Sequence, residues 1–222
     1  MNDDQGAMDR TDPSPLAVPG TAHGGATAER MLADLVARIR DCRICAPHLP
    51  LEPRPVVRPR AGARILIAGH APSRAVHETR TPWNDPSGDR LRDWLGIDRE
   101  TFYGSDRIAI VPMGFCYPGT VKGAGDNPPR PECAATWHGQ LVPAMRRVEL
   151  TLCLGRYAID WHLGQRRGRT LTDTVADWQS HWPRYLPLPH PSGRNNGWLA
   201  RNRWFEADVL PVLRSRVAAL LA

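Results

Sequence analysis

The sequence has almost no lysine, no long apolar run and no apolar stretch near its start. Lys122 is the single lysine, and every other basic side chain is arginine. Apolar runs such as those at residues 65–68 and 150–154 are far shorter than the roughly 20 residues that a membrane-spanning helix needs. Residues 1–6 are acidic, which is untypical of a secretory signal. We therefore expect a cytoplasmic protein that does not bind membranes and keeps its thiols reduced.

A glycine-rich dinucleotide-binding motif is also missing, since no G-x-G-x-x-G pattern follows a predicted strand. What the chain has is an ordinary globular composition, with 41% hydrophobic and 23% charged residues, so it can bury a sizeable core. The net charge of +6 is uneven, because residues 1–30 hold five acidic and two basic side chains. The basic remainder suits a polyanionic partner, and a genome-wide arginine bias is the alternative explanation.

The chain divides into a tail and one domain. Residues 1–27 are rich in Gly, Pro, Ala, Ser, Thr and Asp without apolar periodicity, which predicts a disordered acidic tail, and residues 28–222 form the domain. Apolar residues at helical spacing predict a helix over residues 27–41. Five prolines predict extended coil over residues 47–59.

Short apolar runs then alternate with amphipathic segments. The runs predict strands at residues 64–69, 107–112, 150–155 and 182–188. The amphipathic segments predict helices at residues 89–95, 131–148, 156–163 and 204–221. This alternation is typical of a three-layer α/β/α sandwich around a central four-stranded, mostly parallel sheet. Ligands of such sheets bind beyond the carboxyl ends of the strands, so we expect the site in residues 69–89, 112–127 and 190–203.

Four of the five cysteines are placed to form a group. Cys42 and Cys45 make a CxxC pair, Cys116 follows the second predicted strand, and Cys133 begins the next helix. Four thiolates suit Zn²⁺ or an iron–sulfur cluster, and the residue types do not distinguish the two. Cys153 lies in the middle of an apolar strand, where an inert core thiol is expected.

Two segments carry a family resemblance. Residues 69–83, which begin Gly-His-Ala-Pro-Ser and end Thr-Pro-Trp, resemble the first motif of the iron–sulfur (family 4) uracil-DNA glycosylases, whose consensus begins Gly-Glu-Ala-Pro-Gly. Residues 190–198, His-Pro-Ser-Gly-Arg-Asn-Asn-Gly-Trp, resemble the second motif of that superfamily. The four cysteines fall where the family holds its [4Fe-4S] cluster. The similarity covers about residues 30–216.

The resemblance implies a uracil-DNA glycosylase-like fold and a base-excision activity. Such an enzyme hydrolyses the N-glycosidic bond of uracil or a related deaminated base in DNA. Its partner is DNA, and we expect a monomer. The cofactor implied is a structural [4Fe-4S] cluster, with zinc as the alternative. Its implied ligands are Cys42, Cys45, Cys116 and Cys133.

The resemblance also assigns roles to side chains. Trp83 matches the aromatic residue that stacks on the flipped base, and His190 matches the histidine that stabilises the departing base. Gly69 and Ala71 form the small-residue loop that approaches the base. The loop expected to press into the minor groove of DNA holds Ser192, Arg194 and Asn195.

Two departures from the family pattern bear on the base that is bound. His70 stands where the family has a glutamate, and Pro112 stands where an asparagine reads uracil. A proline offers neither an amide side chain nor a backbone N–H, so Met113 or a main-chain group would have to take over base binding.

Activation of the attacking water has three candidates: His70, Asn84 and Asp85. Asp85 could orient the water as carboxylates do in glycoside cleavage, or simply cap a turn. Two other functions stay open. One is a non-catalytic module that binds damaged or single-stranded DNA, and the other is an unrelated α/β nucleotide-binding protein with a zinc site.

Overall fold

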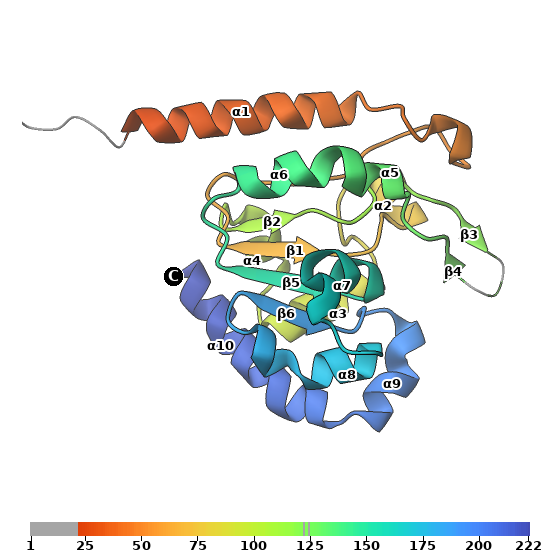
Figure 1. Ribbon diagram of the computed structural model, residues 1–222, viewed down its shortest axis with the longest axis vertical. Coiled ribbons are helices and arrows are strands. Elements are labelled where there is room, and N and C mark those ends of the chain that lie inside the picture. The colour runs from red at the N-terminus through yellow and green to blue at the C-terminus, as the bar shows by residue number, and fades with distance from the viewer. Residues whose placement is uncertain (1–21, 122, 124) are drawn as a thin grey trace, which may run out of the picture.

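The structure of the protein, a computed structural model, describes residues 22–121, 123 and 125–222 (Figure 1). Its centre is a four-stranded sheet in the order β2-β1-β5-β6, in which all neighbours are parallel. The strands are β1 (Ile65–Ala68), β2 (Ile108–Ile110), β5 (Leu150–Leu154) and β6 (Tyr185–Leu188). All four predicted strands are therefore confirmed, each shorter than expected at its ends.

Helices surround this sheet. They are α1 (Ala22–Arg40), α2 (Arg74–Thr79), α3 (Pro86–Leu95), α4 (Arg99–Gly104), α5 (Pro131–Cys133), α6 (Gly139–Ala144), α7 (Arg156–Leu163), α8 (Leu171–Ala176), α9 (Asn196–Arg201) and α10 (Leu210–Leu221). The predicted helix at 131–148 is divided by a π-helical turn, Ala134–His138, and ends at Ala144. The predicted tail needs one correction, because α1 already begins at Ala22. Residues 1–21 of that tail lie outside the described residues.

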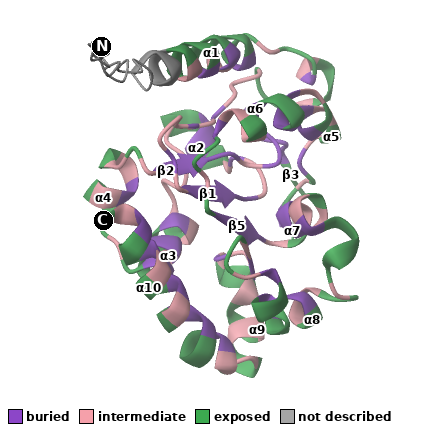
Figure 2. Ribbon diagram, turned by 60° about the vertical axis from the view of Figure 1, so that its left-hand side comes forward, coloured by how far each residue is buried: buried purple, intermediate pink, exposed green. Residues whose placement is uncertain are grey.

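The two faces of the sheet are covered by different helices. Ile65 and Ile67 of β1 pack with residues of α3, α4 and α10, whereas Leu66 packs with α1 and α6 and Ala68 with α7. This follows from the pleat, which sends successive side chains to opposite faces. Figure 2 shows the buried strands enclosed by helices that turn their buried residues inward. The three-layer α/β/α sandwich predicted from the alternation is confirmed.

Parallel register brings the functional loops to one edge. Ala68 of β1 lies opposite Cys153 of β5, and Leu154 lies opposite Leu188 of β6, so these strands end together. Cys153 is fully buried, and burial raises its pKa, as expected of an inert core thiol. A small antiparallel hairpin, β3 (Thr120–Val121) and β4 (Gly125–Asp126), lies beyond the same edge in Figure 1.

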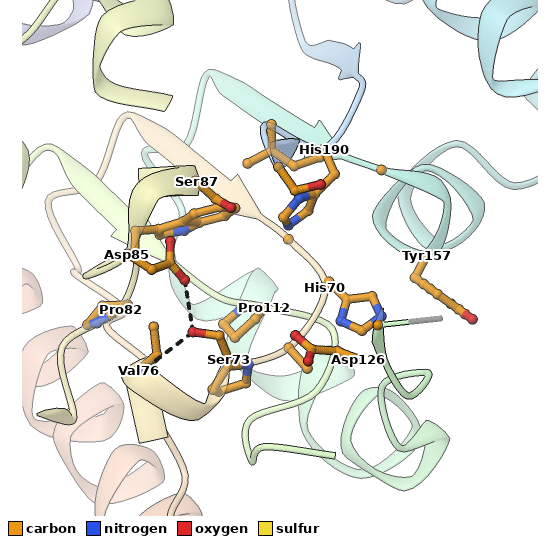
Figure 3. Close-up of a pocket in the computed structure, with 18 of the residues that line it drawn as sticks. His70, Ser73, Val76, Pro82, Asp85, Ser87, Pro112, Asp126, Tyr157 and His190 are labelled. Atoms are coloured by element: carbon orange, nitrogen blue, oxygen red, sulfur yellow. Dashed lines mark hydrogen bonds between the residues drawn. The ribbon is translucent and has the colours of Figure 1, made fainter. Parts of the chain in front are cut away.

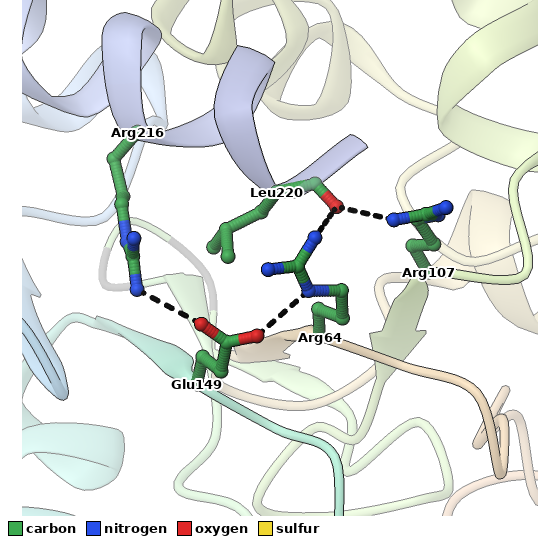
Figure 4. Close-up of polar contacts among 5 residues, drawn as sticks. All are labelled: Arg64, Arg107, Glu149, Arg216 and Leu220. Carbon is green, nitrogen blue, oxygen red and sulfur yellow. Dashed lines mark hydrogen bonds and ion pairs between the residues drawn. The ribbon is translucent and has the colours of Figure 1, made fainter. Parts of the chain in front are cut away.

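The opposite edge anchors the C-terminal helix (Figure 4). Arg64 donates to the carboxylate of Glu149 (2.7 Å) and to the carbonyl of Leu220 (3.2 Å), and Arg107 donates to the same carbonyl (3.4 Å). Arg216 of α10 donates to the other oxygen of Glu149 (3.1 Å). Arginines placed at the final carbonyls of α10 complement its dipole, so this helix is held away from the ligand edge.

His138, in the π-helical turn, is buried and neutral. Its ring stacks on Phe115 with centroids 5.5 Å apart, and its Nε2–H donates to the carbonyl of Pro112 (3.1 Å). Nδ1 has no hydrogen-bond partner among the described residues. Burial lowers the pKa of His138 to about 4.

We expect acid to destabilise the protein through His138. Because its pKa is lower in the folded than in the unfolded state, the unfolded chain takes up the proton first as the pH falls through about 6.5. The free energy of unfolding should drop by up to about 3 kcal/mol from this group between pH 6.5 and 4. Urea unfolding at several pH values measures the drop. His138→Phe keeps the stacking ring but should make the dependence less steep, while other histidines with lowered pKa values, such as His190, keep their share. An equally steep dependence in that variant would contradict the assignment.

Candidate active site

A cavity of about 360 Å³ opens at the carboxyl edge of the sheet. Its walls come from the loop after β1, the N-terminal turn of α3, the β3–β4 hairpin, the start of α7 and the loop after β6 (Figure 3). Eight of the predicted site residues line it: Gly69, His70, Ala71, Trp83, Asp85, His190, Ser192 and Arg194. Residues more than 100 positions apart are thus brought into one cavity.

Trp83 is fixed in an unusual backbone conformation beside His190. The two rings lie 5.5 Å apart between centroids, at an angle of 31°. Trp83 has a positive φ of 59°, which non-glycine residues adopt at an energetic cost. Two glycines make room for it: a Cβ at Gly88 would overlap the carbonyl oxygen of Trp83, and one at Gly69 would lie 2.9 Å from the indole. Arg92 also donates to the carbonyl of Trp83 (3.3 Å).

His190 is held as a neutral imidazole. Burial, and then the nearby His70, lower its pKa to about 4, while Asp85 and Asp126 act in the opposite direction. Asn195 donates to the backbone carbonyl of His190 (2.7 Å) and so fixes the loop that carries the ring. At neutral pH the ring therefore offers one N–H donor to a ligand in the cavity.

Asp85 both caps a helix and lines the cavity. Its Oδ1 accepts from the backbone N–H of Gly88 (3.0 Å) as the N-cap of α3, and its Oδ2 accepts from the hydroxyl of Ser73 (2.8 Å). The turn interpretation of Asp85 is therefore correct. Because both carboxylate oxygens already accept hydrogen bonds, this side chain is stiffly positioned in the wall.

His70 faces Tyr157 and a carboxylate that sequence reasoning missed. Its ring meets the edge of Tyr157 with centroids 5.2 Å apart. Burial lowers the pKa of His70, and the charge of Asp126 raises it. Asp126 lines the cavity from β4, a strand of two residues, and no motif in the sequence marks it. Only the expectation that residues 112–127 contribute to the site pointed to this region.

Three predicted residues do not line the cavity, and two of these predictions need correction. The side-chain oxygen of Asn84 accepts from Arg99 (2.8 Å), so this amide is engaged outside the cavity rather than at a water. Met113 is 4% exposed and packs in the core with Ala68 and Ala134, so it is not a base-binding residue. The side chain of Asn195 does not line the cavity either, and it contributes by donating a hydrogen bond to the backbone carbonyl of His190.

The main chain near Pro112 is also engaged. The N–H groups of Met113 and Gly114 donate to the carbonyls of Gly69 (2.9 Å) and His70 (3.0 Å). The carbonyl of Pro112 accepts from His138. The N–H groups of Met113 and Gly114 are therefore not available to replace the family's asparagine without breaking a bond of the fold.

The hairpin and the loop after β6 meet through an arginine. Arg194 is exposed, but its guanidinium lies against Gly125 of β4, where a Cβ would overlap its atoms. Gly125 has a φ of 95°, so both its conformation and this contact require glycine. The predicted DNA-contacting arginine is thus part of the wall of the cavity as well.

The four predicted ligand cysteines affect one another electrostatically. Burial, and then the other thiols, raise the pKa of Cys133 to about 12 and that of Cys116 to about 11. Cys45 and Cys133 are buried, and all four are free thiols. The N–H of Phe115 donates to the sulfur of Cys133 (3.5 Å). These raised pKa values mean that the thiols stay protonated at neutral pH unless a bound cation stabilises the thiolates. No three His, Cys, Asp or Glu side chains of residues 22–121, 123 and 125–222 are arranged to hold a single metal ion.

The sheet and the cavity define an α/β protein whose ligand site lies at the carboxyl edge of parallel strands. A family model described as the Uracil DNA glycosylase superfamily matches residues 57–214. The chain belongs to this superfamily, whose members act on DNA, and membership indicates a DNA glycosylase in general. In the described part of the chain, no helix is long and apolar enough to span a bilayer.

We expect Gly88→Ala to destabilise the protein by about 3 kcal/mol, because its Cβ collides with backbone atoms of Trp83 that cannot move aside. Thermal unfolding measures the loss. Gly139→Ala is the matched control, since a Cβ there meets no atom within 4 Å. Equal melting temperatures for the two variants would show that the Trp83 turn is not tightly packed.

Proposed function

We propose that this chain is a DNA glycosylase that hydrolyses the N-glycosidic bond of uracil or another deaminated base and leaves an abasic site. The observation that carries the proposal is the pairing of Trp83 with a half-buried, neutral His190 in the cavity at the strand ends. Superfamily membership supports action on DNA. The finer assignment to the iron–sulfur branch rests on the two motifs and the four cysteines.

The cavity supplies the groups that bind a flipped base. Trp83 offers an aromatic face for stacking, held by its two glycines. The N–H of His190 is placed to donate to a carbonyl oxygen of the base. This hydrogen bond strengthens as the glycosidic bond breaks and negative charge collects on the base, so it stabilises the transition state more than the substrate.

Water attack completes the reaction. The water oxygen forms a bond to C1′ of the deoxyribose, and the C1′–N bond breaks with its electron pair leaving on the base. His70 is neutral at physiological pH because burial lowers its pKa, so it can accept the proton of the water. Asp85 contributes negative charge near the sugar, where positive charge develops.

Recognition of the base differs here from the family pattern, in which the side chain of an asparagine contacts uracil. Pro112 replaces the amide, and the neighbouring backbone is engaged in the fold. The polar side chains that line the cavity and could read a base edge include those of His70, His190 and Asp126. This arrangement favours a test against several deaminated bases rather than uracil alone.

The decisive experiment offers oligonucleotides with uracil, hypoxanthine or xanthine, single- and double-stranded, and detects abasic sites by alkaline cleavage. We expect cleavage of at least one, and His190→Ala should reduce the rate at least a hundredfold while DNA binding persists. His48→Ala is the control, because His48 does not line the cavity. Binding of damaged DNA without cleavage of any base would establish the non-catalytic module instead.

We propose further that Cys42, Cys45, Cys116 and Cys133 hold a structural [4Fe-4S] cluster. The mutual influence of the four thiols and the N–H donor at Cys133 support it. Such a cluster would tie the segment after α1 to β2 and α5. Zinc is the alternative, and a colourless protein would favour it. A cytoplasmic location and a monomeric state stay predictions.

Because a metal site forms only in the folded state, its loss should lower stability. We expect Cys42→Ser to remove the brown colour and visible absorption and to lower the melting temperature by several degrees. Removal of the cluster from the wild-type protein with a chelator should also abolish the colour and lower the melting temperature. Cys153→Ala, at the core thiol, should keep the colour. Unchanged melting after removal of the cluster would refute its structural role.

A further inference from the structure

A carboxylate on the β3–β4 hairpin faces the same cavity as His70. Asp126 and His70 both line the cavity, and Figure 3 shows them next to each other at its rim. The two residues come from different loops, one after β1 and the other after β2. No hydrogen bond or ion pair joins these two described side chains, and the charge of Asp126 acts on His70 across the cavity by raising its pKa.

The hairpin holds this carboxylate in place. Thr120 lies directly opposite Asp126 in the antiparallel register, and its hydroxyl donates to Oδ1 of Asp126 (2.8 Å). The same hydroxyl lies 2.6 Å from that of Tyr117, a buried residue, which can therefore donate to it. A chain of hydrogen bonds thus connects Asp126 to the body of the domain.

The loop that carries His70 is equally well fixed. The carbonyls of Gly69 and His70 accept from the N–H groups of Met113 and Gly114, so the loops after β1 and β2 are joined by two backbone bonds. Hence neither partner depends on a freely moving segment. A geometry of this kind is what a catalytic base requires of its supporting residue.

The other carboxylate of the cavity is not placed for this task. Asp85 already accepts from Gly88 and Ser73 with its two oxygens. Its electrostatic effect falls on His190 rather than His70. Asp126 is therefore the acidic residue suited to support His70.

We propose that Asp126 supports the active site through its charge: its carboxylate, held by the hairpin in the same cavity as His70, favours the His70 imidazole as the base that takes a proton from the attacking water. The inference rests on the proposed glycosylase function. In that step the water oxygen bonds to C1′, its proton passes to His70, and the base departs with the electrons of the broken C1′–N bond.

Other groups also lie near His70, and they stay unchanged in every variant that the test compares. The Tyr157 ring meets it edge-on with the guanidinium of Arg156 above that ring, and His190 lies nearby. Asp126 is exposed, so water screens its charge. The effect of removing this charge should accordingly be moderate and specific to His70.

The test compares Asp126→Asn with Asp93→Asn, an exposed carboxylate on α3 outside the cavity. On the base that the wild type excises, Asp126→Asn should lower kcat roughly tenfold and leave KM within about twofold. In the plot of kcat against pH, the rise on the acidic side should move to lower pH for Asp126→Asn, because loss of the carboxylate lowers the pKa of His70. Asp126→Glu should restore part of the rate, and Asp93→Asn should match the wild type.

A second measurement does not need activity. The pKa of His70, followed by NMR of the imidazole and assigned with His70→Gln, should fall by about 0.5 unit in Asp126→Asn. A wild type that excises no base would refute the glycosylase proposal, and this titration would still decide whether Asp126 supports His70. An active enzyme whose Asp126→Asn variant keeps kcat, its pH profile and the pKa of His70 would overturn the inference alone.

Discussion

Parallel pairing of β1 with β5 and of β5 with β6 is the constraint on which the rest of the structure depends. Because all three strands run the same way, the loops that follow them open on one edge, and Gly69, Gly155 and His190 become neighbours there. The contacts between these loops, such as that between the rings of Trp83 and His190, would be lost if one of these strands were reversed. The pairing in turn is stabilised by burial of alternate strand side chains under helices on both faces.

Burial also sets the chemistry of this edge. Two imidazoles, His70 and His190, are held without charge, although carboxylates lie at the walls of the same cavity. A neutral imidazole can accept a proton in one place and donate an N–H in another, which is what hydrolysis of a glycosidic bond requires. Under the proposed glycosylase function, one residue type would serve two roles, separated only by the loop that carries each ring.

Features that depend on regular periodicity were predictable, and features that depend on a few tertiary contacts were not. The strand at residues 150–154 was found because four of its five residues are apolar, and such a run favours burial over exposure to water. In contrast, α2, α4, α8 and α9 have six residues each, too few for a helical period to emerge. In the site, motif residues such as Trp83 and His190 were placed correctly in one cavity. Met113 was misplaced because the direction of a loop side chain is set by packing, and Asp126 was missed because a two-residue strand leaves no pattern.

The contact between Arg194 and Gly125 joins two loops that lie far apart in the sequence. Arg194 comes from the segment after β6, whereas Gly125 precedes the carboxylate of the hairpin. If the proposed glycosylase binds a phosphate of DNA with Arg194, it does so with a side chain that also covers the hairpin that carries Asp126. Substitution of Arg194 would then affect both the contact with DNA and the wall of the cavity.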